Sequence, residues 1–415
     1  APLTEAQLKM LIKLIQPDLE DATKQSTTFS LIKAILSRKM IVNEVYDLMT
    51  TISEISIRSQ SQQIREVSRA VFIKFLLDYP LGQPRLQKHI EFIVENLAYD
   101  HESGRQSAME LVIEIFEKFP KHVLLEYVEF FFFPLILRMI NDESQICRKS
   151  AATTLSLLFT KLPEQNMKNI HKIVQQWFES ENPNLQRAAA QTTTLLLDHL
   201  KLSFRSYLVK YLRLIVNCII PTETQNESND MEIDQSTENW EPIYYSLTLF
   251  IKLGTTFSDI LFSDEGTSIV SASVNWLLHP HQWIRAVSSR VLGLYFSLIN
   301  PETLTLQAKS KKMKKSLFDD KFILFKITRS LSLQIRGEHF TDSMGTQAVK
   351  NLFFIGKCFH SHPELEIQQT KEEFSLDEFS LSTQLNGNVK EGEEREEEEK
   401  EEEEEENVDN DENEM

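Results

Sequence analysis

The chain has 415 residues, a net charge of −18 at neutral pH and only 10 glycines. At this length it either divides into several domains or grows as a repeat array, because one domain usually holds about 100–200 residues. Tight turns and phosphate-cradling loops need glycine, so its scarcity argues against α/β nucleotide-binding folds and many-turned β folds.

The negative charge is concentrated near the C-terminal end. Residues 391–415 hold 17 acidic and 2 basic side chains, which leaves a net charge of −3 for the first 390 residues. The three cysteines, Cys147, Cys218 and Cys358, lie far apart, do not suggest a disulfide framework and favour a reducing compartment such as the cytosol or nucleus. The most apolar stretch, 130–137, is shorter than the roughly 20 residues that cross a bilayer, and no signal-peptide pattern precedes it, so we expect a soluble protein.

The dominant pattern along the chain is a repeat that starts at an arginine and recurs about every 40 residues. Five segments align without gaps, and their first residues are Arg65, Arg105, Arg148, Arg187 and Arg285. Three residues later comes a small side chain, which lets a neighbouring helix approach closely: Ser68, Ala108, Ala151, Ala190 and Ser288. Fifteen residues after the arginine a helix stop follows, at Pro80, Pro120 and Pro163, with Leu202 as the exception and Asn300–Pro301 in the last copy.

Offsets of 3, 7 and 14 from the arginine lie on one face of a helix with 3.6 residues per turn. In the first copy this apolar face holds Phe72, Phe75, Leu76 and Tyr79. Three polar side chains are expected to point elsewhere: Arg69, Lys74 and Asp78. An amphipathic segment precedes each of the first four copies, at 41–57, 86–98, 122–140 and 167–179. Two antiparallel helices per period predict an all-α solenoid of HEAT or armadillo type, in which stacking neighbours build the core.

Weaker copies extend the array to seven or eight helix pairs. Lys24 and Lys39 mark one at the start, a degenerate pair is expected around 241–262, and Ala348 takes the arginine position with Pro363 as the stop in the last. We therefore divide the chain into repeats over 1–221, a disordered acidic loop over 222–240, further repeats over 241–363 with a basic insertion at 305–321, and a disordered acidic tail over 364–415.

Catalytic chemistry has little support in the sequence. No phosphate-binding loop, nucleophile elbow or dinucleotide fingerprint occurs. The only close histidine pairs are His279 with His281 and His360 with His362, each near a proline at a helix junction. Further metal ligands are missing around both pairs, so turn or capping roles are favoured over a metal site. We expect no enzyme, no metal and no cofactor.

Two sets of basic residues are candidate sites. The arginine column is expected to form a structural ladder, each guanidinium contacting an acid or carbonyl in the adjacent copy, with a phosphate-binding stripe as the alternative. Five lysines lie within seven residues and could neutralise RNA phosphates: Lys309, Lys311, Lys312, Lys314 and Lys315. They equally suit a nuclear import signal or a solvated loop. The acidic tail either binds basic partners or only keeps the chain soluble.

Several runs resemble one known family. The most telling are LLDYPLG at 76–82 and YDHESGRQSAMEL at 99–111. Agreement continues in FFFPLILRMINDES at 131–144, HPHQWIRAVSSRVLGLYF at 279–296 and QAVKNLFFIGK at 347–357. They are similar to the C-terminal part of a very large HEAT-repeat component of the small-subunit processome, the "down-regulated in metastasis" or U-three small nucleolar RNA-associated protein twenty family. Because its members are far longer, we expect this chain to be part of a longer protein.

The resemblance implies a non-catalytic nucleolar scaffold of ribosome assembly, needed for early processing of the small-subunit precursor rRNA. It implies processome proteins, precursor rRNA and guide small nucleolar RNA as partners, with no membrane and no small-molecule substrate. Two alternatives stay open. One is a karyopherin-like nuclear transport receptor or another HEAT-repeat adaptor that binds proteins. The other is a metal-dependent enzyme, which rests only on the histidine pairs.

Overall fold

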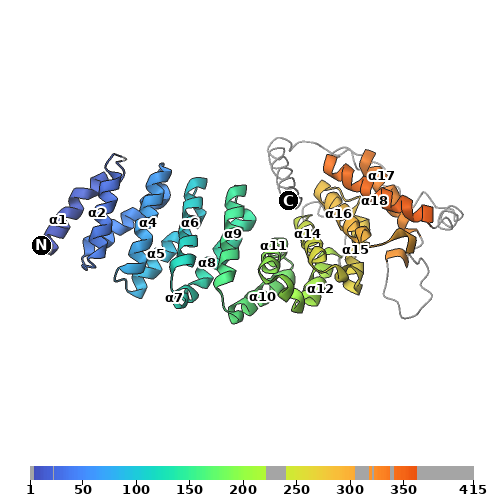
Figure 1. Ribbon diagram of the computed structural model, residues 1–415, viewed down its shortest axis with the longest axis horizontal. Helices are drawn as coiled ribbons and strands as arrows, with labels where there is room; N and C mark the ends of the chain where they lie inside the picture. Colours follow the sequence, from blue (N-terminus) through green and yellow to red (C-terminus); the bar gives the residue numbers. More distant parts are fainter. Residues whose placement is uncertain are drawn as a thin grey trace. The chain divides into compact units, whose positions relative to one another are not determined.

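The chain forms a stack of helices (Figure 1). The computed structural model describes residues 4–21, 23–220, 240–303, 317–319, 322–336 and 341–361. Within these ranges there are seventeen α-helices and no strand. The chain divides into two units, Ala1–Gly356 and Lys357–Met415, and the second is described only as far as Ser361. The helices and contacts discussed below lie in the first unit, except for the last residues of the final helix.

The helices alternate between two layers and make eight pairs. The first helices of the pairs are α1 (Glu5–Ile15), α3 (Asn43–Arg58), α5 (Gln83–Glu95), α8 (Val128–Asn141) with the short α7 (Lys121–Glu126) before it, α10 (Glu164–Phe178), α12 (Leu208–Ile219), α15 (Asp264–Trp276) and α17 (Ile323–Arg336). The second helices are α2 (Gln25–Ser37), α4 (Gln62–Asp78), α6 (Glu102–Lys118), α9 (Gln145–Lys161), α11 (Pro183–Leu200), α14 (Trp240–Thr256), α16 (Gln282–Ser297) and α18 (Asp342–Ser361). Each second helix from α2 to α14 contacts the next one in its layer, which confirms the predicted HEAT-type solenoid.

The repeat positions are buried or end helices as their spacing predicts. The small residue of each copy is completely buried between helices, at Ser68, Ala108, Ala151, Ala190 and Ser288. The apolar face of α4 is likewise buried, with Phe72 and Phe75 fully enclosed. Helices α4, α6 and α9 each end two residues before the predicted proline. The core is therefore the continuous seam between the two layers, to which every pair contributes one face.

Replacing two of the small repeat residues, Ser68 and Ser288, is expected to increase stability. The hydroxyls of Ser68 and Ser288 are buried and have no hydrogen-bond partner, whereas three other copies carry alanine there. Because an unsatisfied buried hydroxyl costs free energy and alanine favours helix, Ser68→Ala and Ser288→Ala should each raise the free energy of unfolding by about 1 kcal/mol. Ser107→Ala is the control in a thermal melt, since its hydroxyl accepts from Arg69 and donates to the Ser56 carbonyl. A loss in all three variants would contradict the prediction.

Three expectations about the weaker copies need correction. Residues 241–262 do not form a helix pair, because α14 is a single second helix that pairs with α12 before the loop. The arginine is the fourth residue of α4, α6, α9 and α16, which places Gly345 at the equivalent point of α18. Ala348 is thus the buried small residue of that copy, three positions later. Lys24 precedes α2 and does not take the arginine position either.

Elements before and after residues 221–239 are joined by ion pairs. Arg187 contacts Glu241 at 2.9 Å, and three exposed pairs follow along the same junction: Asp198–Lys252, Arg205–Asp259 and Arg213–Glu265. In each pair one partner precedes the predicted loop and the other follows it. The insertion is therefore accommodated while the repeats on both sides remain stacked. The loop itself over 221–239 and the expected tail from 364 onward lie outside the described residues.

Candidate functional site

The candidate site is the row of loops that join the first helix of a pair to the second, together with the arginines that follow them. In four copies the arginine closes its own loop. Nη1 of Arg65 donates to the carbonyls of Ser59 (2.7 Å) and Gln60 (3.4 Å), and Nη1 of Arg148 donates to those of Asp142 (2.8 Å) and Glu143 (3.1 Å). Arg105 and Arg285 bind the equivalent carbonyls, six and five residues back.

This geometry corrects the expected ladder. Four arginines contact carbonyls within their own copy, whereas contacts with an adjacent copy were expected throughout. The reason is local: an arginine in the first turn of a helix reaches back to the loop just before it, where carbonyl groups need donors. Of the five repeat arginines, Arg105 and Arg187 are the two that contact another copy within the described residues.

Arg187 departs from the common pattern. Its Nη1 donates to Glu241 of α14, its Nη2 donates to the Ile140 carbonyl of α8, and its guanidinium lies 5.4 Å from the ring centre of Tyr245. The side chain therefore joins the copy before it to the copy after it. Its own loop carbonyl at Ser180 is bound by Gln186 instead.

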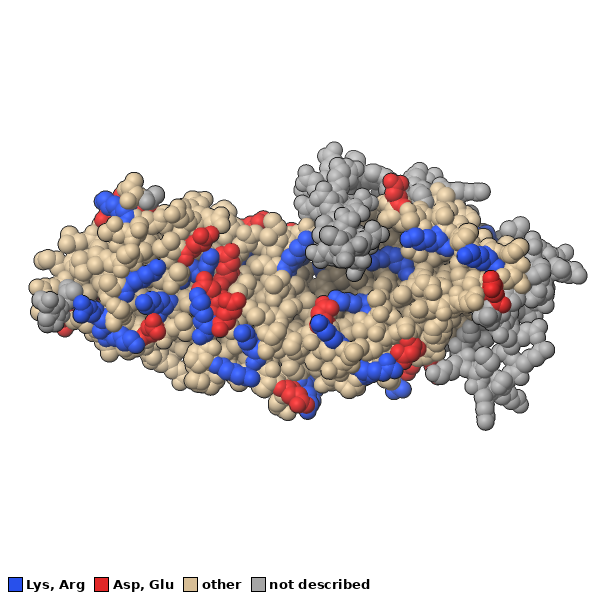
Figure 2. Space-filling view, viewed as in Figure 1, with Lys and Arg blue, Asp and Glu red and all other residues tan. Residues whose placement is uncertain are grey.

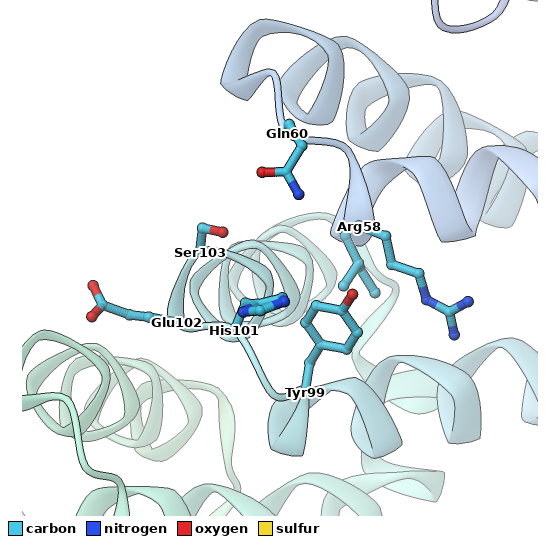
Figure 3. A pocket seen from close by; sticks show the side chains of 7 residues that line it. Arg58, Gln60, Tyr99, His101, Glu102 and Ser103 are labelled. Carbon is cyan, nitrogen blue, oxygen red and sulfur yellow. The ribbon is translucent and has the colours of Figure 1, made fainter.

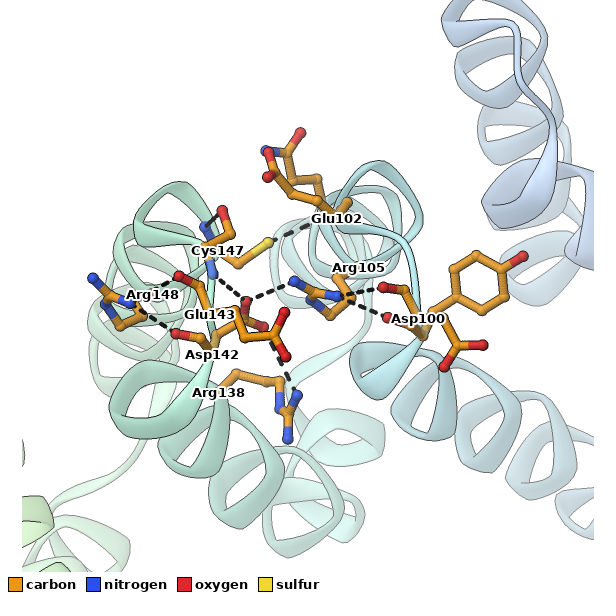
Figure 4. Close-up of polar contacts among 11 residues, drawn as sticks. Asp100, Glu102, Arg105, Arg138, Asp142, Glu143, Cys147 and Arg148 are labelled. Carbon is orange, nitrogen blue, oxygen red and sulfur yellow. Dashed lines mark hydrogen bonds and ion pairs between the residues drawn. The ribbon is translucent and has the colours of Figure 1, made fainter. Parts of the chain in front are cut away.

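Arg105 makes the most deeply buried charge pair of the row (Figure 4). Its Nη2 donates to Oδ1 of Asp142 in the next copy at 2.8 Å, and the Asp142 side chain is completely enclosed. The Ser144 backbone N–H donates to the same Oδ1, and Arg138 lies 3.8 Å from Oδ2. Burial alone would lower the pKa of Arg105, but the Asp142 carboxylate outweighs it and raises the pKa. Arg285 makes no ion pair within the described residues, and burial lowers its pKa.

A pocket of about 280 Å³ opens one step earlier in the row, between the loop after α3 and the loop before α6. Figure 3 shows Gln60 on one side, with Tyr99, His101 and Ser103 on the other and Arg58 at the edge. The Arg58 guanidinium lies 6.0 Å from the centre of the Tyr99 ring. Sequence reasoning did not find this pocket, because its residues follow no repeat spacing.

Arg69 makes contacts that its predicted position, away from the apolar face, did not indicate. Its side chain is only 10% exposed and contacts Glu110, Glu114 and Ser107 of α6, with 3.3 Å to Glu114 and 3.1 Å to Ser107. Arg69 therefore holds α4 against α6. The available signal was the spacing of Glu110 and Glu114, four residues apart on one face of the next copy.

The two histidine pairs and the lysine cluster were the remaining candidates for a metal or phosphate site. Nδ1 of His279 accepts from the backbone N–H of His281, and Nδ1 of His281 accepts from that of Trp283. Both are thus turn and capping residues, as predicted. Across the part of the chain that the structure describes, three or more His, Cys, Asp and Glu side chains nowhere gather as a metal site would require. His362 and the lysine cluster, Lys309, Lys311, Lys312, Lys314 and Lys315, lie outside the described residues.

A buried histidine gives the stack a pH dependence. His171 is 2% exposed, stacks on Tyr207 and lies 2.8 Å through Nδ1 from the Tyr211 hydroxyl, and burial lowers its pKa to about 4. The unfolded chain, with a pKa near 6.5, binds the proton first as pH falls, so stability is lost between about pH 6.5 and 4.

Because of His171, we expect the free energy of unfolding to fall by about 2 kcal/mol between pH 7.5 and pH 5. Urea unfolding at the two pH values measures this loss, and His171→Gln should reduce it. His89, whose pKa burial also lowers to about 4, supplies a further loss that the variant retains. An unchanged pH dependence in His171→Gln would exclude His171 as a source.

Charge over the described surface is mixed. Lysines and arginines lie among aspartates and glutamates on the face seen in Figure 2, consistent with the near-neutral body of the sequence. None of the described helices combines the length and apolar character needed to cross a membrane.

Comparison with known proteins finds two relatives that carry the same name. No family model matches the chain. The U3 small nucleolar RNA-associated protein 20 of Schizosaccharomyces pombe is 26% identical over 392 residues, which cover 92% of this chain and 15% of that protein. The protein of the same name from Saccharomyces cerevisiae is 26% identical over 320 residues, covering 74% and 12%. Along most of its length the chain is therefore similar to proteins named U3 small nucleolar RNA-associated protein 20.

The chain spans only about a seventh of the length of these U3 small nucleolar RNA-associated proteins. Among solved structures, a HEAT-like repeats protein from Thermococcus onnurineus aligns at 16% identity over 75% of this chain and 97% of that one, with a TM-score of 0.36. Kap121p bound to Ste12p aligns at 10% identity over 88% and 34%, with a TM-score of 0.37. At these TM-scores the likeness carries no conclusion about function.

Proposed function

We propose that the chain is a non-catalytic scaffold of the small-subunit processome and is required for early processing of the small-subunit precursor rRNA in the nucleolus. The observation that carries the proposal is its similarity, along 92% of its length, to a U3 small nucleolar RNA-associated protein. The architecture supports it. The buried polar groups of the repeat row bind loops and neighbouring helices, as at Arg105 and Arg187, and so hold a binding surface in place.

Its partners in this proposal are other processome proteins, precursor rRNA and guide small nucleolar RNA. The lysine cluster supplies a phosphate contact. Five lysines within seven residues can release several counterions when they bind RNA, and this makes the contact depend on salt. Replacing all five by glutamine should reduce ultraviolet crosslinking of the chain to RNA, and equal crosslinking would assign these lysines to a role without RNA.

The proposed function is tested by depletion in the cells of origin. Rapid degradation of the tagged protein should cause uncleaved small-subunit precursor rRNA to accumulate, while the large-subunit rRNA continues to mature. The expected measurement is a precursor blot in the first hours after depletion, with rescue by the undegradable protein as the control. Normal small-subunit processing after complete depletion would refute the proposal.

A further inference from the structure

Two neighbouring steps of the loop row differ: the step between the copies of Arg65 and Arg105, and the step between the copies of Arg105 and Arg148. At the next step Asp142 crosses from its own loop and contacts Arg105 at 2.8 Å in the copy before. The residue at the same loop position one copy earlier, six before the arginine, is Tyr99. A tyrosine supplies no carboxylate, and Arg65 makes no ion pair within the described residues.

The Tyr99 ring lies over Gly104 on the helix that follows it. A Cβ at position 104 would come within 2.2 Å of Tyr99 Cδ1, so the ring needs glycine beneath it. The residue before the repeat arginine is glycine only in this copy; the others have Ile64, Cys147, Gln186 and Ile284. Tyr99 and Gly104 therefore act together. The ring folds back onto α6, and the 280 Å³ pocket lies between this loop and the loop after α3.

The pocket is lined mainly by hydrogen-bond donors. The Arg58 guanidinium, the Gln60 amide and the hydroxyls of Tyr99 and Ser103 border it, and Ile57 contributes an apolar wall that is 1% exposed. Arg58 is half exposed, and its nearest carboxylate, Glu54, is 4.0 Å away. The one acidic lining residue, Glu102, accepts a hydrogen bond from Gln106, and its carboxylate is directed away from Gln60 in Figure 3.

We propose that this pocket binds an aspartate or glutamate side chain from an acidic segment of a protein partner. The next step of the row shows which chemistry fits between two such loops, since a carboxylate occupies that interface. At the pocket the carboxylate comes from outside the chain and receives hydrogen bonds from Gln60, Ser103 and Tyr99, beside the charge of Arg58. The partner's carboxylate would thus lie between two neighbouring loops, as the Asp142 carboxylate does at the next step. It goes beyond the proposed scaffold role, because it does not depend on which particle the chain serves.

Fluorescence anisotropy with the full chain at low salt tests the pocket. The probe is a labelled Gly-Ser-Asp-Glu-Asp-Ser-Gly peptide, compared with its Asn/Gln counterpart. We expect the acidic peptide to bind and the neutral one not to bind. Arg58→Glu and Gln60→Glu should each weaken binding about fivefold or more. Lys88→Glu, the same reversal at an exposed residue of α5, should leave it unchanged.

A second variant imitates the next copy. Tyr99→Asp with Gly104→Ala supplies an internal carboxylate opposite Arg65 and should abolish peptide binding while the melting temperature shows a folded chain. Tyr99→Phe keeps the ring but removes one of the three hydrogen-bond donors, so it should weaken binding about threefold or more. Equal binding by the wild type and the Arg58→Glu and Gln60→Glu variants would overturn the proposal. So would an oligouridylate that binds more tightly than the peptide and is weakened by the same variants, since the ligand would then be a nucleic-acid phosphate.

Discussion

Replacing Arg105 with methionine should lower the free energy of unfolding by about 3–5 kcal/mol, because it leaves the carboxylate of Asp142 buried without its charged partner. The Asp142 side chain is completely enclosed, and its second cation, Arg138, lies at 3.8 Å. The same substitution also removes the donors to the Tyr99 and Asp100 carbonyls, both 3.0 Å away. Chemical denaturation of the purified chain measures the loss.

Arg65→Met is the matched control, since Arg65 closes its loop in the same way but makes no ion pair within the described residues. Its loss should be about 1–2 kcal/mol. The double variant Arg105→Met/Asp142→Leu should be more stable than Arg105→Met alone, because no buried charge remains. Equal losses for Arg65→Met and Arg105→Met would show that the crossing to Asp142 contributes little.

Gly266→Ala should be the most damaging single methyl addition in the described part of the chain, with a loss of about 3 kcal/mol. Gly266 is buried in the first turn of α15, and a Cβ there would lie 1.9 Å from the Ile260 carbonyl oxygen. This obstacle is backbone, held in turn by the Ser263 hydroxyl, which donates to that oxygen at 2.7 Å. A rotamer change cannot relieve the overlap, so the turn before α15 has to move.

Gly356→Ala is the control for this prediction. A Cβ at position 356 would meet no atom within 4 Å, and the residue is exposed inside α18. Alanine should raise stability by about 0.5–1 kcal/mol at such a helix position. Thermal melts of both variants compare the two, and a loss of similar size at both positions would contradict the steric explanation for Gly266.

The sequence allowed prediction of features that depend on helical periodicity. The small residues after each arginine and the apolar face of α4 follow from 3.6 residues per turn, and the structure buries them in the seam between layers. The prolines mark the helix ends, and α4, α6 and α9 each end two residues before one. What periodicity could not predict is which side chain meets which across a junction. Arg105 contacts Asp142 of the next copy in addition to its own loop, whereas Arg148 binds the carbonyls of its own loop.

Irregular segments limited the rest of the prediction. A helix pair was expected at 241–262, but the structure pairs α14 with α12, which lies before the insertion. The residues between these two helices have no helical pattern in the sequence, so the pairing could not be predicted. The pocket beside Tyr99 arises from a deviation from the repeat, a tyrosine and a glycine that occur together in one copy only. A search for repeats averages such deviations away, although in this chain they mark the candidate binding site.

The most direct test of the proposed scaffold role is to crosslink the tagged chain to RNA with ultraviolet light in its own cells and to sequence the attached RNA. A processome scaffold predicts enrichment of small-subunit precursor rRNA or its guide small nucleolar RNA, with the protein in the nucleolus. A cytoplasmic protein without crosslinked RNA would contradict the proposed function.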